Sequence, residues 1–158
     1  MNKVFYWSPF ISKVATVKSV LNSAEAINRS FKKNNFKAYI IDAVHEWKDF
    51  EDEIKEKKIE LIYLNKNSIF NSYKKEGFIR SRLAYLYVFF KSFFPLVKIL
   101  QEKKPNYFVI HLITSLPLFL FIFKNFKPKL ILRISGLPKM TLLRKLLWKL
   151  ASKNIYKI

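Results

Sequence analysis

The chain has 158 residues, 30 basic and 11 acidic, and carries a formal charge of +19, yet 51% of its residues are hydrophobic. Disorder requires low hydrophobicity together with high charge, so this composition excludes a disordered basic tail and predicts one folded domain over residues 1–158. With no cysteine, two histidines and two glycines, the sequence excludes disulfides and the glycine-rich loops that hold nucleotide phosphates, and we expect neither a metal site nor a cofactor.

The first part of the chain alternates short apolar runs with helical patterns. Apolar or β-branched runs predict strands at residues 3–7, 36–42 and 59–64. Apolar residues at helical spacing predict a helix over about 14–33, and an acidic stretch predicts a shorter helix over about 47–57.

The same alternation continues after a polar segment, 65–76, which we expect to be a loop. The aromatic-rich segment 78–103 predicts a helix, or two half-helices that meet at Pro95. Further on, the pattern predicts strands at 107–111, 129–135 and 155–158, a helix at 115–123, and a helix that Thr141 caps.

Strands that alternate with helices indicate an α/β fold, a Rossmann-like three-layer α/β/α domain around a parallel sheet of about six strands. Ligands of such folds bind beyond the carboxyl ends of the strands, where the strand order reverses. The segments to inspect are therefore 8–12, 42, 65, 111–115 and 135–139. From them and the neighbouring strand we select a substrate-binding set, which consists of Ser8, Ser12, Thr114, Arg133, Ser135, Gly136 and Lys139.

His111 is the residue that we expect to act in chemistry. It ends a predicted strand and precedes Thr114 and Ser115 at a helix start, so an imidazole and two hydroxyls converge at the ligand-binding edge. A neutral imidazole there could orient or deprotonate a substrate hydroxyl. The alternative is a histidine that hydrogen-bonds to the local backbone and binds no ligand.

Arg133 stands within an apolar run that predicts a strand, two residues before Ser135 and on the same face. An arginine in such a place needs a carboxylate or phosphate partner. Gly136 permits close approach of a ligand to the backbone. An anionic ligand and a structural salt bridge both explain this arrangement.

The last predicted helix is amphipathic. Its leucines cover one side, whereas Arg144, Lys145 and Lys149 cover the other, with Trp148 among them. These four residues could rest on an anionic membrane surface, but the pattern favours a solvated basic face on an ordinary packed helix.

We expect a cytoplasmic protein, peripheral at most on the inner membrane face. Charges and Pro95 within 78–103 argue against a membrane span.

The charge is distributed unevenly. Residues 1–60 carry eleven basic and nine acidic side chains, whereas residues 61–158 carry nineteen basic and two acidic ones. A field of one sign attracts nucleic acid or anionic membranes, although compositional bias explains the excess equally well. Nucleic acid is not the expected partner, because most aromatic residues stand in apolar runs typical of a core.

Three segments resemble the N-terminal domain of GT-B-fold glycosyltransferases, especially the retaining bacterial enzymes of family 4 (group 1) that build cell-surface polysaccharide and lipopolysaccharide. They are the first strand with its loop (3–10), the strand Lys-Pro-Asn-Tyr-Phe-Val-Ile-His (104–111) and the segment Leu-Ile-Leu-Arg-Ile-Ser-Gly-Leu-Pro-Lys (130–139). Two features depart from the family: residues 8–12 lack its glycine-rich loop, and Ser135 replaces the usual histidine before Gly136.

The resemblance implies that this domain holds a sugar or lipid-linked acceptor. His111 would be the pocket histidine near the reacting acceptor, and Ser135 and Gly136 would line the cleft between two domains. A C-terminal domain would hold the nucleotide-sugar donor, so we expect a truncated chain that is inactive alone. The alternatives are a non-catalytic basic module that binds a polyanion and the product of a degenerate gene fragment.

Overall fold

A computed structural model describes residues 1–10, 15–30, 35–65, 78–124, 126–134 and 141–158. Six parallel strands form one sheet in the order β3-β2-β1-β4-β5-β6. The strands are β1 (Asn2–Trp7), β2 (Phe36–Asp42), β3 (Glu60–Tyr63), β4 (Tyr107–Ile110), β5 (Lys129–Leu132) and β6 (Ile155–Lys157). The helices are α1 (Thr16–Ser30), α2 (Glu51–Glu56), α3 (Phe78–Lys103), α4 (Ser115–Phe123) and α5 (Leu142–Ala151), with 3-10 turns at Lys48–Phe50 and Ser152–Asn154.

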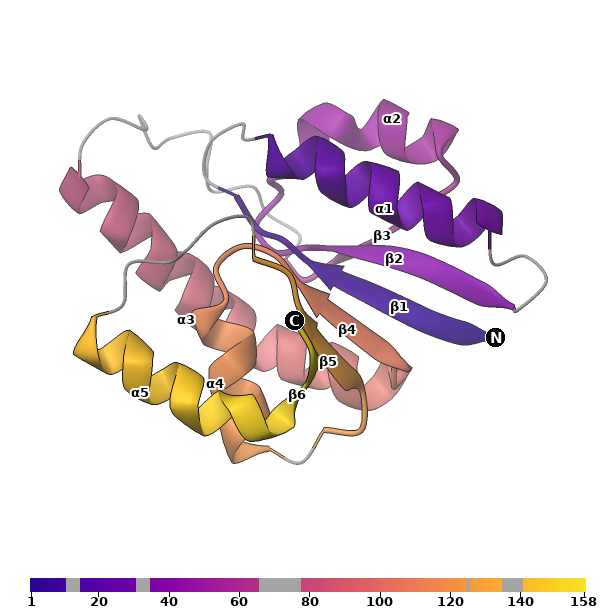
Figure 1. Ribbon diagram of the computed structural model, residues 1–158. Helices are drawn as coiled ribbons and strands as arrows, with labels where there is room; N and C mark the ends of the chain where they lie inside the picture. Colours follow the sequence, from indigo (N-terminus) through magenta and orange to yellow (C-terminus); the bar gives the residue numbers. More distant parts are fainter. Residues whose placement is uncertain (11–14, 31–34, 66–77, 125, 135–140) are drawn as a thin grey trace.

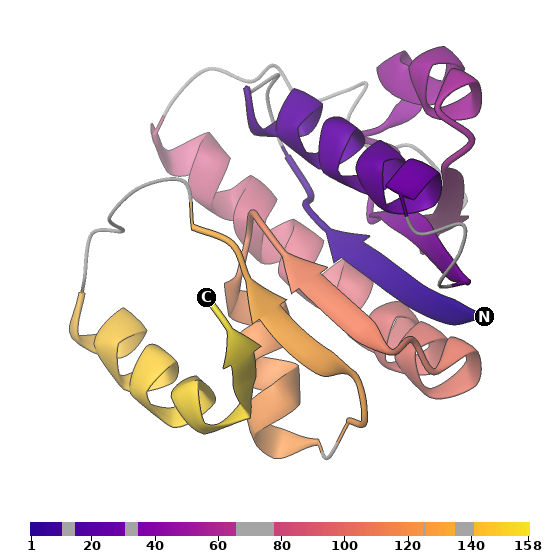
Figure 2. The same ribbon diagram turned by 45° about the vertical axis from the view of Figure 1, so that its right-hand side comes forward.

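The helices form two layers, one on each face of the sheet (Figures 1 and 2). Helices α1 and α2 cover one face, and α3, α4 and α5 cover the other. Crossovers between parallel strands are right-handed, so helices change face where the strand order reverses, here between β1 and β4. The predicted Rossmann-like α/β/α fold with a six-stranded parallel sheet is confirmed.

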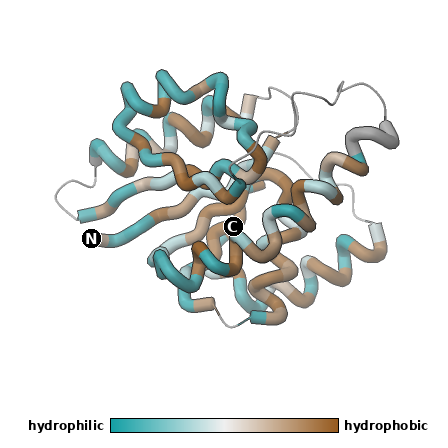
Figure 3. Tube along the Cα trace, turned by 180° about the vertical axis from the view of Figure 1, so that it is seen from behind, coloured by the Kyte–Doolittle hydropathy of each residue, from teal (hydrophilic) through white to brown (hydrophobic). Residues whose placement is uncertain are grey.

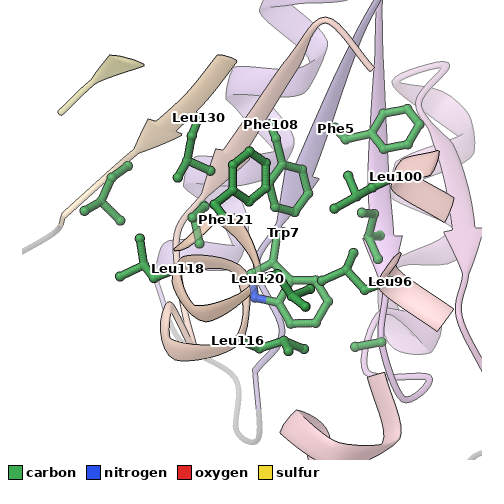
Figure 4. Close-up of a cluster of buried hydrophobic side chains, with 14 of the residues drawn as sticks. Phe5, Trp7, Leu96, Leu100, Phe108, Leu116, Leu118, Leu120, Phe121 and Leu130 are labelled. Atoms are coloured by element: carbon green, nitrogen blue, oxygen red, sulfur yellow. The ribbon is translucent and has the colours of Figure 1, made fainter. Parts of the chain in front are cut away.

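Strand β1 shows why the strands appear in the sequence as unbroken apolar runs. Val4 and Tyr6 point into the core under α1 and α2, whereas Phe5 and Trp7 point into the core under α3, α4 and α5. Figure 4 shows Phe5 and Trp7 among leucines of α3 and α4. Because both faces of the sheet are buried, both sets of alternating side chains must be apolar.

Helix α3 is a single element of 26 residues with Pro95 inside it. The sequence left open whether two half-helices meet there, and the structure has one helix. Its sheet-facing side buries Val88, Leu96 and Leu100, and this packing holds a helix that a proline weakens by removing one backbone donor. Most of the predicted loop 65–76 lies outside the described residues.

Strand β5 is shorter than predicted and ends at Leu132. Arg133 therefore follows the strand at its carboxyl end instead of standing inside it. The backbone N–H of Arg133 still donates to the carbonyl of Ile110 at 2.8 Å, which holds this segment beside the end of β4.

Candidate functional site

The segment after β4 is tied to the end of β1, at the point where the strand order reverses. The N–H of His111 donates to the carbonyl of Trp7 at 2.9 Å, and the indole Nε1 of Trp7 donates to the carbonyl of Ile113 at 3.1 Å. Ile113 has a φ of 46°, an unfavourable value for a β-branched residue. Such strain persists where surrounding contacts enforce it, and it gathers at functional sites.

His111 is buried at this point but faces a cavity. Only 6% of its surface is exposed, and its Nε2 has no hydrogen-bond partner among the described residues. Burial, and secondarily the charge of Arg133, lower the pKa of His111 from 6.5 to about 4. The imidazole is therefore neutral at pH 7 and can take part in a hydrogen bond, but it is a poor proton acceptor there.

The cavity beside His111 has a volume of about 650 Å³ and collects residues from α3, from both sides of the α4 start, from the end of β5 and from α5. Its polar lining consists of His111, Thr114, Ser115, Arg133, Thr141 and Arg144. Its apolar lining includes Tyr85, Leu143, Leu147 and Trp148. A few converging polar groups in an otherwise apolar cavity are typical of a small-molecule site.

Arg133 supplies positive charge to this cavity. Its side chain is exposed, and its Nη2 donates to Ser19 Oγ of α1 at 2.8 Å. The expectation that Arg133 stands inside a strand was wrong, because β5 ends one residue earlier. The guanidinium remains available to an anionic ligand, since the Ser19 bond uses one of its five donors.

Two helices begin at the cavity. The Thr114 side chain at the start of α4 makes no capping hydrogen bond, whereas Thr141 accepts one from the N–H of Arg144 at 3.4 Å at the start of α5. Helix N-termini carry partial positive charge. Together with Arg133 they make the polar side of the cavity favourable for hydroxyl or anionic groups.

The structure brings together part of the predicted set. His111, Thr114 and Arg133 line the cavity, and so do Arg144 and Trp148, for which the sequence had left open a membrane-facing or a solvated position. Ser8 is fully buried with no partner for its hydroxyl among the described residues, and it does not belong to the cavity lining. Four predicted residues lie outside the described part of the chain: Ser12, Ser135, Gly136 and Lys139.

Tyr85 was missed as a lining residue. It lies on α3, and no local pattern connects it with a loop 26 residues further along the chain. Thr141 was expected only as a helix cap. Leu143 was expected only as a packing residue, but it also lines the cavity. These residues meet His111 because the α3, α4 and α5 helices share one face of the sheet.

A second group at the same edge of the sheet involves two carboxyl groups. Asp42 is fully buried at the end of β2, and both oxygens of Glu46 accept backbone N–H groups, from Ala43 at 3.1 Å and Val44 at 2.7 Å. Burial and the neighbouring Asp42 carboxylate raise the pKa of Glu46 well above its usual value. Asp42 was expected at this edge of the sheet, whereas Glu46 was missed, because a glutamate four residues after a strand carries no distinctive signal.

The Asp42 and Glu46 pair closes a turn, as the N–H of His45 also donates to Asp42 Oδ1 at 2.6 Å. Among the described residues, no three histidine, aspartate or glutamate side chains gather in a group that could hold a metal ion. Another cavity, of about 580 Å³, lies on the α1 side of the sheet and is mostly apolar, with Arg133 and Lys157 among its lining residues. The cavity at His111 is therefore the stronger candidate.

Comparison with known proteins supports the fold and leaves the family open. No family model matches the chain, and no curated protein matches it. Among solved structures, it is similar to the UDP-GlcNAc 2-epimerase from Neisseria meningitidis bound to UDP-GlcNAc, with a TM-score of 0.57 and 14% sequence identity. The match covers 98% of this chain and 38% of that protein, so this chain spans less than half the length of its structural neighbour and shares its fold.

Proposed function

We propose that this chain is the acceptor-binding half of a sugar transferase, with the acceptor held in the cavity at His111. One observation carries the proposal: a neutral, buried imidazole whose Nε2 has no partner among the described residues lines a cavity at the reversal of strand order. A buried polar atom without a partner is costly, and a ligand hydroxyl would satisfy it.

The lining suits a polyhydroxylated acceptor. Hydroxyl groups can hydrogen-bond to His111 and Thr114, a neighbouring anionic group can reach Arg133, and Tyr85 and Trp148 offer apolar ring faces. His111 in its neutral form would orient the acceptor hydroxyl through a hydrogen bond, since its lowered pKa makes it a poor proton acceptor. The UDP-GlcNAc bound to the structural neighbour supports a sugar-related function in general terms.

The donor belongs elsewhere in this proposal. We assign the nucleotide-sugar to a second domain beyond these 158 residues, since the glycine-poor sequence offers no phosphate-binding loop and the chain spans 38% of its neighbour. We therefore expect no sugar transfer from a nucleotide-sugar by the 158-residue chain alone.

Saturation-transfer NMR on the purified chain tests the proposal, with methyl glycosides as acceptor probes and UDP-GlcNAc as the nucleotide-sugar probe. We expect the wild-type chain to give saturation-transfer signals from the methyl glycosides, and we expect these signals to disappear in His111→Asn. His45→Asn is the matched control, because His45 lies on the turn after β2 with a φ of 66° that asparagine tolerates. Glycoside signals should persist in this control.

Two results would contradict the proposed function. One is glycoside binding that His111→Asn leaves unchanged, which would place the acceptor elsewhere. The other is sugar transfer from UDP-GlcNAc by the isolated wild-type chain, which would mean that these 158 residues hold both substrates.

A further inference from the structure

The outer surface of α3, α4 and α5 carries an unusual amount of exposed apolar side chain. On α3, the exposed residues Leu83, Leu86, Phe90 and Phe94 follow one another at three- or four-residue spacing and so form one stripe along the helix. The buried residues of the same helix lie on its opposite side, against the sheet. The stripe therefore points away from the core.

Helix α5 repeats this arrangement, contrary to the expectation that its leucines pack inside. The exposed stripe consists of Leu142, Leu143, Leu146 and Leu150, and the first two are 87% and 81% exposed. Leu147 and Trp148 make the packing contacts with the core instead. Ala151 is the residue of α5 that is fully buried.

Helix α4 joins the two stripes, because it packs against both α3 and α5 (Figure 1). Phe119 contacts Phe89 and Phe93 of α3 with ring centroids at 6.0 and 6.3 Å, and its ring lies at a tilt to that of the exposed Phe123, with centroids 4.6 Å apart. Figure 3 shows long hydrophobic stretches on these three helices, whereas α1 and α2 are largely hydrophilic. We call this surface the α3–α5 face, defined by Leu83, Leu86, Phe90, Phe94, Phe119, Phe123, Leu142, Leu143, Leu146 and Leu150.

Basic residues border this face. Lys91 and Lys98 are exposed beside the α3 stripe, and Lys145 and Lys149 are exposed beside the leucines of α5. Residues 78–158 contain sixteen basic side chains and one acidic one, Glu102. Long basic side chains that flank aromatic and leucine rows are the pattern of surfaces that lie in a membrane interface.

We propose that the α3–α5 face docks on an anionic lipid bilayer, with its apolar rows in the headgroup and acyl boundary and its lysines at the phosphates. A second copy of this chain fits less well, because it would set one strongly basic surface against another. The helix α3 includes a segment, Arg82–Lys103, long and apolar enough to span a membrane, but a third of it is buried within the domain. The packing of α3 on the sheet fits a helix that lies along the bilayer surface.

This docking surface adjoins the cavity at His111. Leu143 belongs to both, and the exposed Tyr85 also lines the cavity. A bilayer on the α3–α5 face would therefore bring lipid headgroups to the cavity mouth. The docking proposal depends on none of the polar residues of the cavity and stands or falls separately from the proposed function.

Vesicle sedimentation with the purified chain tests the proposal. We compare vesicles of phosphatidylcholine alone with vesicles that also contain phosphatidylglycerol, at low and high ionic strength. We expect binding to the anionic vesicles that weakens with added salt. Phe90→Ser combined with Phe94→Ser should weaken it about tenfold or more, because two large apolar side chains leave the bilayer. Ile158→Ser, at a similarly exposed residue directly after β6, should leave it unchanged.

A charge-reversed pair keeps the test independent of apolar substitutions. Lys145→Glu with Lys149→Glu should weaken binding at least about tenfold, at roughly 1 kcal/mol for each basic residue near the surface. Lys48→Glu with Lys58→Glu changes the net charge equally on exposed residues near α2 and should weaken it far less. Circular dichroism checks that each variant is folded.

The proposal is overturned if the chain does not sediment with anionic vesicles at low ionic strength, or if both charge-reversed pairs reduce binding equally. It is also overturned if Phe90→Ser with Phe94→Ser abolishes a discrete dimer in light scattering while vesicle binding stays unchanged. That last result would assign the face to a second copy of the chain.

Discussion

At the scale of single residues, two things explain the candidate role of His111: its position in the sequence and its surroundings in the fold. Its predicted place at the end of an apolar strand marked it as a candidate, but its neutral state follows from burial beside Arg133. Neither burial nor that neighbour can be deduced from its local sequence, since Arg133 lies 22 residues further along.

The lowered pKa of His111 predicts a dependence of stability on pH. The unfolded chain takes up a proton near pH 6.5 and the folded chain only near pH 4, so this group makes the free energy of unfolding fall as pH drops through that window. In His111→Asn, the loss of unfolding free energy between pH 7 and pH 4 should be smaller by roughly 1–2 kcal/mol, allowing for solvent screening. Urea unfolding at pH 7, 5.5 and 4 measures it. An unchanged slope relative to the wild-type chain would contradict the assignment.

The carboxyl pair after β2 predicts the opposite sign. The raised pKa of Glu46 means that the folded state favours the protonated acid, so the pair costs stability as pH rises above the usual glutamate range. Asp42→Asn removes one charge, keeps the oxygen that accepts from His45, and offers an amide donor to Glu46. We expect about 1 kcal/mol of added stability at pH 7 and a smaller gain near pH 4.

Thermal and urea unfolding of Asp42→Asn at both pH values measure this difference. Asp52→Asn is the control, because Asp52 is fully exposed on α2 and its replacement should change stability little at either pH. Loss of stability in Asp42→Asn at pH 7 would show that the charged pair supports the turn.

At the scale of elements, the positions of the helices were predicted well and the sides that they bury less well. The amphipathic pattern of α5 indicated leucines inside and basic residues outside, whereas four of its leucines are exposed. Periodicity reveals that a helix has an apolar side, but it does not reveal whether another part of the protein covers that side.

Helix α3 allows a direct test of how packing overrides local preference. In Pro95→Ala, the new backbone N–H can donate to the carbonyl of Lys91, and alanine is the best helix former. We expect the free energy of unfolding to rise by about 1–3 kcal/mol, reduced by whatever packing the half-buried ring contributes. Chemical denaturation measures the change. Gln101→Ala, at an exposed site of the same helix, is the control and should change the free energy of unfolding by only a few tenths of the Pro95→Ala effect. A Pro95→Ala chain less stable than the wild type would show that the ring is needed for packing.

At the scale of the whole molecule, charge and apolar surface are gathered in the same half. Residues 78–158 contain α3, α4 and α5 and fifteen of the nineteen excess positive charges. Several aromatic residues that were expected in the core, among them Phe90 and Phe119, contribute instead to the exposed α3–α5 face. Nucleic acid remains an unexpected partner, and this stays a prediction, because aromatic rows on convex helices suit an apolar phase better than a strand of bases.

The sequence alone determined the order of strands and helices and the parallel sheet, and it predicted the edge at which we expect a ligand. These features depend on local propensity and hydrophobic period, and on chain connectivity with a fixed hand. Tertiary structure alone decided that Tyr85, His111, Arg133 and Thr141 share one cavity, and that the leucines of α5 remain uncovered. Contacts between distant segments and burial depend on how whole layers pack, and no short window of sequence contains that information.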